Sequence, residues 1–206
     1  MLRSSLLLFL LTVVPQQGTV GPSRGAGGSV AAAEGPNYTV NGELKMPERY
    51  REWVFLTSGV DMSYSPNAAI AGHSMFDNVF VNPSAYRAFS ETGRWPDKTT
   101  LVLEVRAAEG PSSINKRGHT QSREVMGIEV HVKDSKLEGG WGFYEFDGPG
   151  SAKIVKRPAS CYECHEEHAA VDTTFVQFYP TLLGLAKAKG TLSAPYLKEV
   201  ASDRSK

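Results

Sequence analysis

Two stretches of the chain, residues 99–106 and 125–133, alternate over most of their length between apolar and polar side chains. A period of two is typical of a β-strand with one face toward a core. The apolar positions are Leu101, Leu103 and Val105, followed by Met126, Ile128, Val130 and Val132. The polar positions are Glu104 and Arg106, followed by Glu129, His131 and Lys133. The pattern predicts two strands, with Met126 in the core and His131 at the surface.

Three shorter apolar runs, at 53–57, 78–82 and 141–146, bring the predicted strands to about five. Residues 109–121 are rich in Gly, Ser and charged side chains, which indicates a loop. The short spacings between the runs are typical of antiparallel hairpins.

Helices are predicted between and after these strands. One begins at Pro83, with Asn82 as its N-cap, and Gly93 ends it. Two more are expected near the C-terminus, one running to about Ala170 and one over 181–189. The predicted fold class is α+β, an antiparallel sheet of about five strands with one inserted helix and helices at the C-terminus.

The N-terminal segment indicates export. Arg3 precedes an apolar run at 6–14, which is too short to span a bilayer but fits a signal peptide. We interpret residues 1–33 as a signal peptide and flexible leader, and an uncleaved membrane anchor is the alternative. Because the N-terminal region has no cysteine for lipidation, we expect a periplasmic protein without stable membrane association.

Length and charge narrow the classes further. The 206 residues suggest one domain, at 37–190, followed by a C-terminal tail at 191–206. The chain has 22 Lys and Arg against 22 Asp and Glu, so its formal net charge is zero. A balanced charge gives no reason to expect nucleic acid as a partner.

The sequence Cys161-Tyr162-Glu163-Cys164-His165 contains both cysteines of the chain. C-x-x-C-H is the signature of c-type haem attachment. Two sulfurs about one helical turn apart can each bond a vinyl group of the porphyrin, and the adjacent histidine can bind the iron. The motif predicts one covalent haem c on a C-terminal helix, with Cys161 and Cys164 as attachment sites and His165 as the iron ligand.

Three other uses of these cysteines are weaker. A thioredoxin-like redox site normally belongs to a βαβ unit, and no such pattern precedes the motif. A zinc site could recruit His168 beside the cysteines and His165, but four ligands within eight residues fit a tetrahedron poorly. A disulfide between Cys161 and Cys164 would close a very small loop and stabilise little.

The chain resembles the cytochrome P-460 family, which includes the cytochromes c′-beta, from about Tyr50 to Leu183. The resemblance rests on the order and spacing of short motifs around the haem signature. These are 50–54, 79–83 with Tyr86, 93–97, 127–129, 132–134, Trp141 with Phe143 and Tyr144, Asp172, Phe175 and 178–182. It implies a homodimer whose sheet packs against haem, with a histidine on one side of the iron and an open distal side.

Members of this family either oxidise hydroxylamine or bind nitric oxide and similar small ligands. The first group carries a lysine cross-linked to the porphyrin, on the strand after a Gly-x-aromatic-x-Asp turn. Our register places Leu103 at that position, whereas Lys98 lies too early, at the turn itself. The resemblance therefore favours the ligand-binding branch.

Two candidates for the distal pocket, Phe76 and Asp77, lie just before the predicted strand at 78–82. Phe76 could cap the iron with apolar surface, and Asp77 could supply acid-base chemistry if it points inward; ordinary packing and solvation are the alternatives. Leu103, at the position of the cross-linking lysine, is the third distal-pocket candidate. Sixth ligands from elsewhere could be His73 or His119 in loops, or the thioethers of Met62, Met75 and Met126.

Three functions follow from an exported haem c. The first is a binding protein in which five-coordinate iron takes nitric oxide or a similar ligand. The second is an enzyme that oxidises hydroxylamine or reduces peroxide at the same iron, and the third is a six-coordinate electron carrier. A redox partner protein is expected for the last two. The absence of a lysine at Leu103 favours the first.

Overall fold

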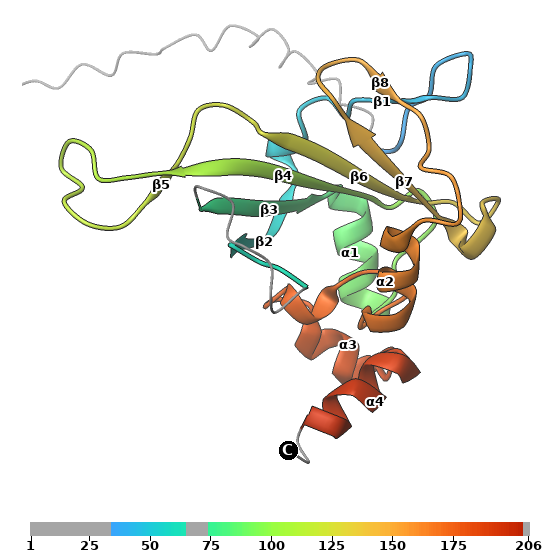
Figure 1. Ribbon diagram of the computed structural model, residues 1–206. Coiled ribbons are helices and arrows are strands. Elements are labelled where there is room, and N and C mark those ends of the chain that lie inside the picture. Colours follow the sequence, from blue (N-terminus) through green and yellow to red (C-terminus); the bar gives the residue numbers. More distant parts are fainter. Residues whose placement is uncertain (1–33, 65–73, 204–206) are drawn as a thin grey trace, which may run out of the picture. The chain divides into compact units, whose positions relative to one another are not determined.

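The computed structural model describes residues 34–64 and 74–203, and these form mainly an antiparallel sheet (Figure 1). Its strands lie in the order β2-β3-β4-β6-β7, and β5 pairs with the end of β4. Strands β1 and β8 pair separately. The bounds are β1 Leu44–Lys45, β2 Val54–Val60, β3 Met75–Val81, β4 Thr100–Glu109, β5 Thr120–Gln121, β6 Gly127–Lys133, β7 Trp141–Phe146 and β8 Ser151–Ala152. The α+β class with an antiparallel sheet is confirmed, although β5 lies in a stretch predicted as loop.

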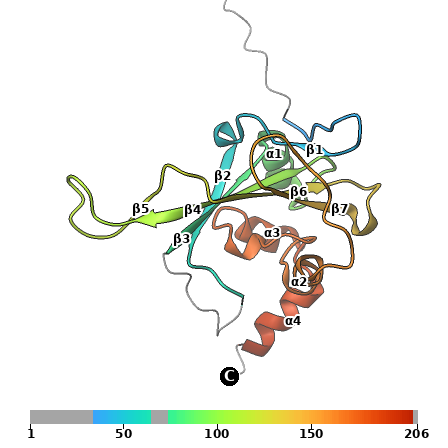
Figure 2. The ribbon, with the colours of Figure 1, turned by 45° about the horizontal axis from the view of Figure 1, so that its top comes forward.

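Helices lie along one side of this sheet, and β1 and β8 lie along the other (Figures 1 and 2). We call these sides the helix face and the far face. The α-helices are α1 Pro83–Thr92, α2 Ser160–His168, α3 Leu183–Lys189 and α4 Ala194–Asp203. Short 3₁₀ turns are η1 Tyr50–Glu52, η2 Glu138–Gly140 and η3 Val176–Phe178. Among the described residues, none of the helices has the length and apolar character needed to cross a membrane.

Helix α1 forms where its local signals predict it. Pro83 occupies the first helical position, and Gly93 ends the helix with φ 71°, a left-handed conformation that glycine adopts without strain. Asn82 acts differently from a usual N-cap, because its Oδ1 accepts a 2.8 Å hydrogen bond from the Thr100 amide of β4 instead of capping α1. The start of α1 is therefore tied to the sheet.

Hydrophobic cores form on both faces of the sheet. The helix-face core joins α1, α2 and the residues after α2 to inward side chains such as Leu101 and Phe143. The far-face core packs Val102, Val130 and Val132 against β1, β8 and η1. Both faces of β4 and β6 are therefore covered along much of their length.

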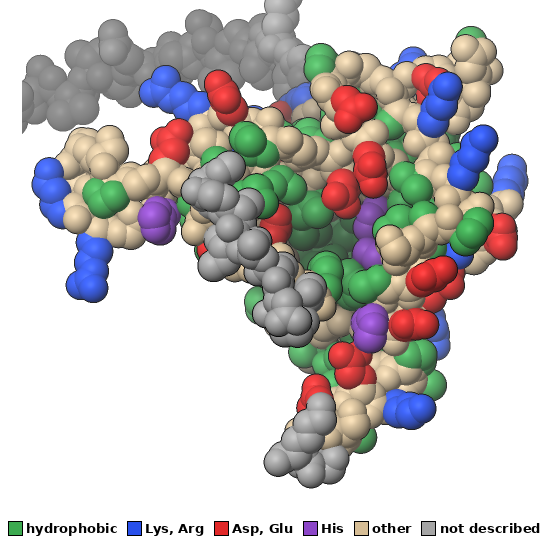
Figure 3. All heavy atoms as spheres, in the orientation of Figure 1, with side chains coloured by type: hydrophobic (Ala, Val, Ile, Leu, Met, Phe, Trp, Pro, Cys, Tyr) green, Lys and Arg blue, Asp and Glu red, His purple; other side chains and the backbone are tan. Residues whose placement is uncertain are grey.

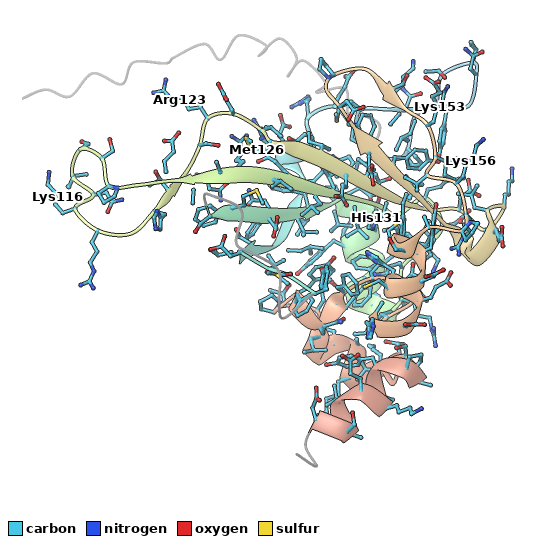
Figure 4. All side chains as sticks on the ribbon, viewed as in Figure 1. Lys116, Arg123, Met126, His131, Lys153 and Lys156 are labelled. Atoms are coloured by element: carbon cyan, nitrogen blue, oxygen red, sulfur yellow. The ribbon has the colours of Figure 1, made fainter. Side chains whose placement is uncertain are left out.

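Two predictions made for the stretch around β6 are wrong. His131 is not a surface residue, because it points to the helix face and lines a cavity there (Figure 4). Met126 is not in the core. It lies just before Gly127, the first residue of β6, and is 53% exposed. Alternation along β6 separates the far-face core from a cavity, in which His131 is half-buried and Glu129 remains exposed.

The far face also buries a charged group, Glu104 of β4, which is 3% exposed. Its carboxylate accepts hydrogen bonds from the Tyr50 hydroxyl and from Nε of Arg51 and Arg106. Burial alone would raise the pKa of Glu104, but hydrogen bonds from Arg106, Tyr50 and Arg51 outweigh it and hold the pKa at about 2. The network ties η1 to the back of the strand that carries Leu103.

The segment interpreted as a C-terminal tail contains α4, which packs against α2. The Ser193 hydroxyl donates a 2.6 Å hydrogen bond to the Ala169 carbonyl just after α2. Nδ1 of His168 lies 3.1 Å from the Glu199 carboxylate, which links α2 to α4. Contacts with α4 therefore hold α2, the helix that carries the two cysteines, in place.

Candidate functional site

A cavity of about 320 Å³ lies between the helix face of the sheet and the residues that follow α2. Strands β2, β3, β4 and β6 each contribute side chains to its wall, and His165 of α2 faces it from the other side. In the space-filling view the hollow is lined mainly by hydrophobic side chains, with acidic and histidine side chains at its edge (Figure 3). Such a cavity, apolar with a few polar groups, is typical of cofactor sites.

The structure brings several of the predicted site residues into this cavity. Asp77, Leu103 and His165 line it, as do Met62 and Met75. Met75 and Asp77 of β3 and Leu103 of β4 reach the cavity because alternation along these neighbouring strands turns their side chains toward the helix face.

Other candidates lie elsewhere. Phe76 does not line the cavity; it pairs with Arg106 of β4, and the alternation of β3 turns it to the far face. His119 is exposed in the loop before β5, and Met126 lies outside the cavity. His73 and the leader at 1–33 lie outside the described residues.

Helix α2 presents the haem motif. Cys161 and Cys164 are three positions apart, so their side chains lie on about the same side of the helix. Both thiols are half-buried and form no disulfide. Burial raises the pKa of Cys164, and the charge of Glu167 adds to the effect. Both sulfurs are therefore free thiols on the helix that also carries His165.

His165 is oriented by a backbone group. Its Nδ1 lies 2.7 Å from the Thr173 carbonyl oxygen. Because a carbonyl can only accept, Nδ1 carries the proton and Nε2 keeps its lone pair. Burial lowers the pKa of His165, partly offset by this hydrogen bond. The side chain is a neutral imidazole with one nitrogen free to bind a metal.

Aromatic rings surround His165. Phe175 lies against it, with ring centroids 4.1 Å apart, and Phe143 and His131 approach at 4.8 and 4.9 Å. His131 stacks on Phe143 at 3.9 Å, and Phe143 stacks on Tyr162 at 4.3 Å. Burial, with a smaller effect of His165, holds the pKa of His131 well below its usual value. This packing fixes the imidazole plane of His165.

These residues fit a haem better than a zinc ion. In the part of the chain that the structure describes, no three His, Cys, Asp or Glu side chains converge as a metal site would require. Two free thiols on one helix, an oriented imidazole and an adjoining apolar cavity are instead the groups that hold a porphyrin.

The model of the family described as Cytochrome P460 matches residues 47–176. The chain belongs to the cytochrome P460 family. It is accordingly a haem-containing cytochrome. The match runs from the residues before η1 through the sheet, α2 and the segment after it, whereas α3 and α4 lie beyond it. A comparison with curated proteins finds no match.

Glu129 and His131 are the two charged or titratable strand residues of this cytochrome's cavity that sequence reasoning did not place there. Glu129 pairs directly with Leu103, and His131 pairs with Leu101. The signal that could have found them is this register, since cross-strand neighbours of a cavity residue face the same cavity. Glu129 places a carboxyl beside the position where the family resemblance expects a cross-linking lysine.

The cavity of the cytochrome therefore contains two carboxyl groups, Asp77 and Glu129. Burial raises the pKa of Asp77, and the charge of Asp61 adds to it. Burial likewise raises the pKa of Glu129, with further contributions from Glu145 and Asp77. Both groups are protonated over a wider pH range than carboxyls with an unperturbed pKa, so they can donate a proton or a hydrogen bond to a bound ligand.

Proposed function

We propose that this cytochrome holds one haem c through thioether bonds from Cys161 and Cys164, with Nε2 of His165 bound to the iron. The shared helix side of the two thiols and the Nδ1 hydrogen bond of His165 support this assignment. When bound, the haem supplies an iron that takes a small ligand and changes oxidation state. The cytochrome would acquire it after export to the periplasm.

The function we propose is binding of nitric oxide or a similar small molecule on the side of the iron that faces the sheet. The observation that carries it is Leu103, which lines the cavity. Its side chain can neither bind iron nor cross-link to a porphyrin. Val79 and Val105 flank it on the same wall and are equally inert as ligands. An apolar wall of this kind favours a small neutral ligand over a charged one.

Asp77 and Glu129 support a second candidate, an enzyme that reduces peroxide. Reduction of hydrogen peroxide to two waters consumes two protons and two electrons. The carboxyls could deliver the protons, and a redox partner protein would supply the electrons. Oxidation of hydroxylamine is less well supported, because Leu103 stands where the resemblance expects the cross-linking lysine.

The test is the absorption spectrum of the reduced protein before and after addition of nitric oxide. A high-spin spectrum with an ordinary Soret band that changes on addition would support the binding protein. A low-spin spectrum unaffected by nitric oxide would refute it and indicate an electron carrier with a sixth ligand such as Met62 or Met75. Haem that stays on the denatured chain, and is lost in the Cys161→Ala/Cys164→Ala variant, would support covalent attachment.

Peroxide turnover, measured in the same preparation, separates the second candidate. If Glu129→Gln lowers turnover at least tenfold while the nitric oxide spectrum is unchanged, proton delivery by Glu129 is supported. Equal turnover in both proteins would refute that role.

A further inference from the structure

The hydrogen bond that orients His165 comes from a tight turn at 171–174, directly after α2. Val171 and Thr174 bridge across the turn, and the Thr174 hydroxyl donates a 2.8 Å bond to the Val171 carbonyl. Asp172 adopts φ 51°, a left-handed conformation that Asp and Asn tolerate better than most residues. The Thr173 carbonyl is presented to Nδ1 of His165 from this turn.

Two contacts hold the turn from outside. Nζ of Lys133, at the end of β6, donates to the Asp172 carboxylate at 2.7 Å and to the Trp95 carbonyl at 2.9 Å. Nε1 of Trp95 donates a 2.8 Å bond to the Thr174 hydroxyl, and both side chains are almost fully buried. Lys133 and Asp172 are themselves only 24% and 21% exposed. The turn is therefore fixed at Asp172 and at Thr174, on both sides of Thr173.

We propose that Lys133 and Asp172 are positioning residues for the histidine ligand: their ion pair holds the turn so that the Thr173 carbonyl keeps its hydrogen bond to His165. This inference rests on the proposed function, in which Nε2 of His165 binds iron. Lys133 lies two residues after His131, on the same face of β6. Strand β6 thus lines the cavity and, through Lys133, also helps to orient His165, which faces the cavity.

The effect on the ligand follows from its chemistry. An Nδ1–H bond to a carbonyl makes the imidazole a stronger electron donor, and such outer partners tune the metal. A stronger donor favours oxidised iron and holds more firmly when nitric oxide binds on the opposite side. Loosening the turn should move the reduction potential to more positive values. It should also make release of His165 in the presence of nitric oxide about three- to tenfold more favourable, the range expected for weakening one hydrogen bond.

The test compares Lys133→Met, Asp172→Asn and the double variant, all purified with haem attached. Met keeps the length and apolar stem of Lys, and Asn keeps the tolerance for a left-handed backbone. Lys98→Met is the matched control, because Lys98 forms a 2.6 Å ion pair with Asp134 just after the end of β6, whereas the bonds of the turn involve Lys133. Lys133→Arg is the rescue variant, since a guanidinium can still bind the Asp172 carboxylate.

Three measurements decide the outcome: the midpoint reduction potential, the coordination of the reduced protein with nitric oxide, and the urea midpoint. We expect both single variants to shift the potential upward and to increase the five-coordinate fraction. The double variant should be no worse than either single variant, because the pair acts as a unit. Lys98→Met and Lys133→Arg should resemble wild type.

A fall in the urea midpoint without any change in potential or coordination would overturn the proposal, since it would leave the ion pair a purely structural role. Failure of the proposed function is recognised separately, with His165→Ala. If that variant keeps the spectrum and potential of the wild type, His165 is not the ligand, and positioning it has no consequence at the iron.

Discussion

Acidification is expected to weaken this fold through one buried carboxylate, Glu104. Its side chain is 4% exposed and accepts hydrogen bonds from Tyr50, Arg51 and Arg106. The pKa of Glu104 is about 2 in the folded protein, against 4.5 for an unperturbed glutamate. A depressed pKa means that the contribution to stability is fully present above pH 4.5 and is lost as the pH falls through about 2.

The size of the effect follows from the two pKa values. The difference corresponds to about 3 kcal/mol of unfolding free energy, of which about 2 kcal/mol are lost between pH 7 and pH 3. Replacing Glu104 by Gln removes this titration but leaves the buried guanidinium of Arg106 without its anion. Breaking a buried pair in this way costs about 3–5 kcal/mol at neutral pH. The Glu104→Gln variant should therefore be less stable at pH 7 and less sensitive to acid.

Urea unfolding followed by far-ultraviolet circular dichroism, at several pH values from 7 to 3, measures both effects. Glu52→Gln is the matched control, because Glu52 forms an exposed pair with Arg49 and should change little. Parallel pH profiles for wild type and Glu104→Gln would refute the reasoning. They would mean that other carboxyl groups, and not Glu104, carry the acid sensitivity.

Two further substitutions test the cavity wall and the end of α1. Leu103→Lys places an amine beside Glu129. When the purified variant is treated with hydrogen peroxide, which takes up the two electrons and two protons released, we expect an N–C bond from the amine to the porphyrin and a red-shifted Soret band. An unchanged mass and spectrum would contradict the placement of Leu103. Gly93→Ala should lower the urea-derived stability by about 2 kcal/mol, because it combines positive φ with a Cβ only 2.8 Å from Cβ of Lys189. Gly190→Ala shares the positive φ without the contact, so an equal loss there would show that the contact contributes nothing.

Elements with local signals could be predicted from the sequence. Pro83 and Gly93 define α1 because proline starts and glycine ends helices for reasons internal to a few residues. The alternation along 99–106 and 125–133 likewise predicts β4 and β6. Helix α4 was missed, although Ser193 followed by Pro195 is a usual helix start, and the Ser193 hydroxyl does accept a bond from the Tyr196 amide.

Positions that depend on three-dimensional pairing could not be predicted in the same way. Alternation shows which residues share a face but not what covers that face, so His131 resembled a surface residue and the cavity beside Glu129 was not predicted. Glu104 is buried only because η1 and its arginine partners cover the far face. Cys161, Cys164 and His165 were identifiable because the chemistry they are predicted to perform requires a spacing that is local in sequence.

The division of the sheet into two covered faces has a consequence for how this protein can change. The far-face core packs against the back of these strands, where Val102, Val130 and Val132 are fully buried. Leu103 and Glu129 alternate with these residues on the same strands, so this part of the cavity wall is backed by a separate core on the opposite face of the sheet. Mutations in the wall can then alter which molecules react there while the protein still folds. A new activity in this scaffold would require only that the side chains on one face be exchanged.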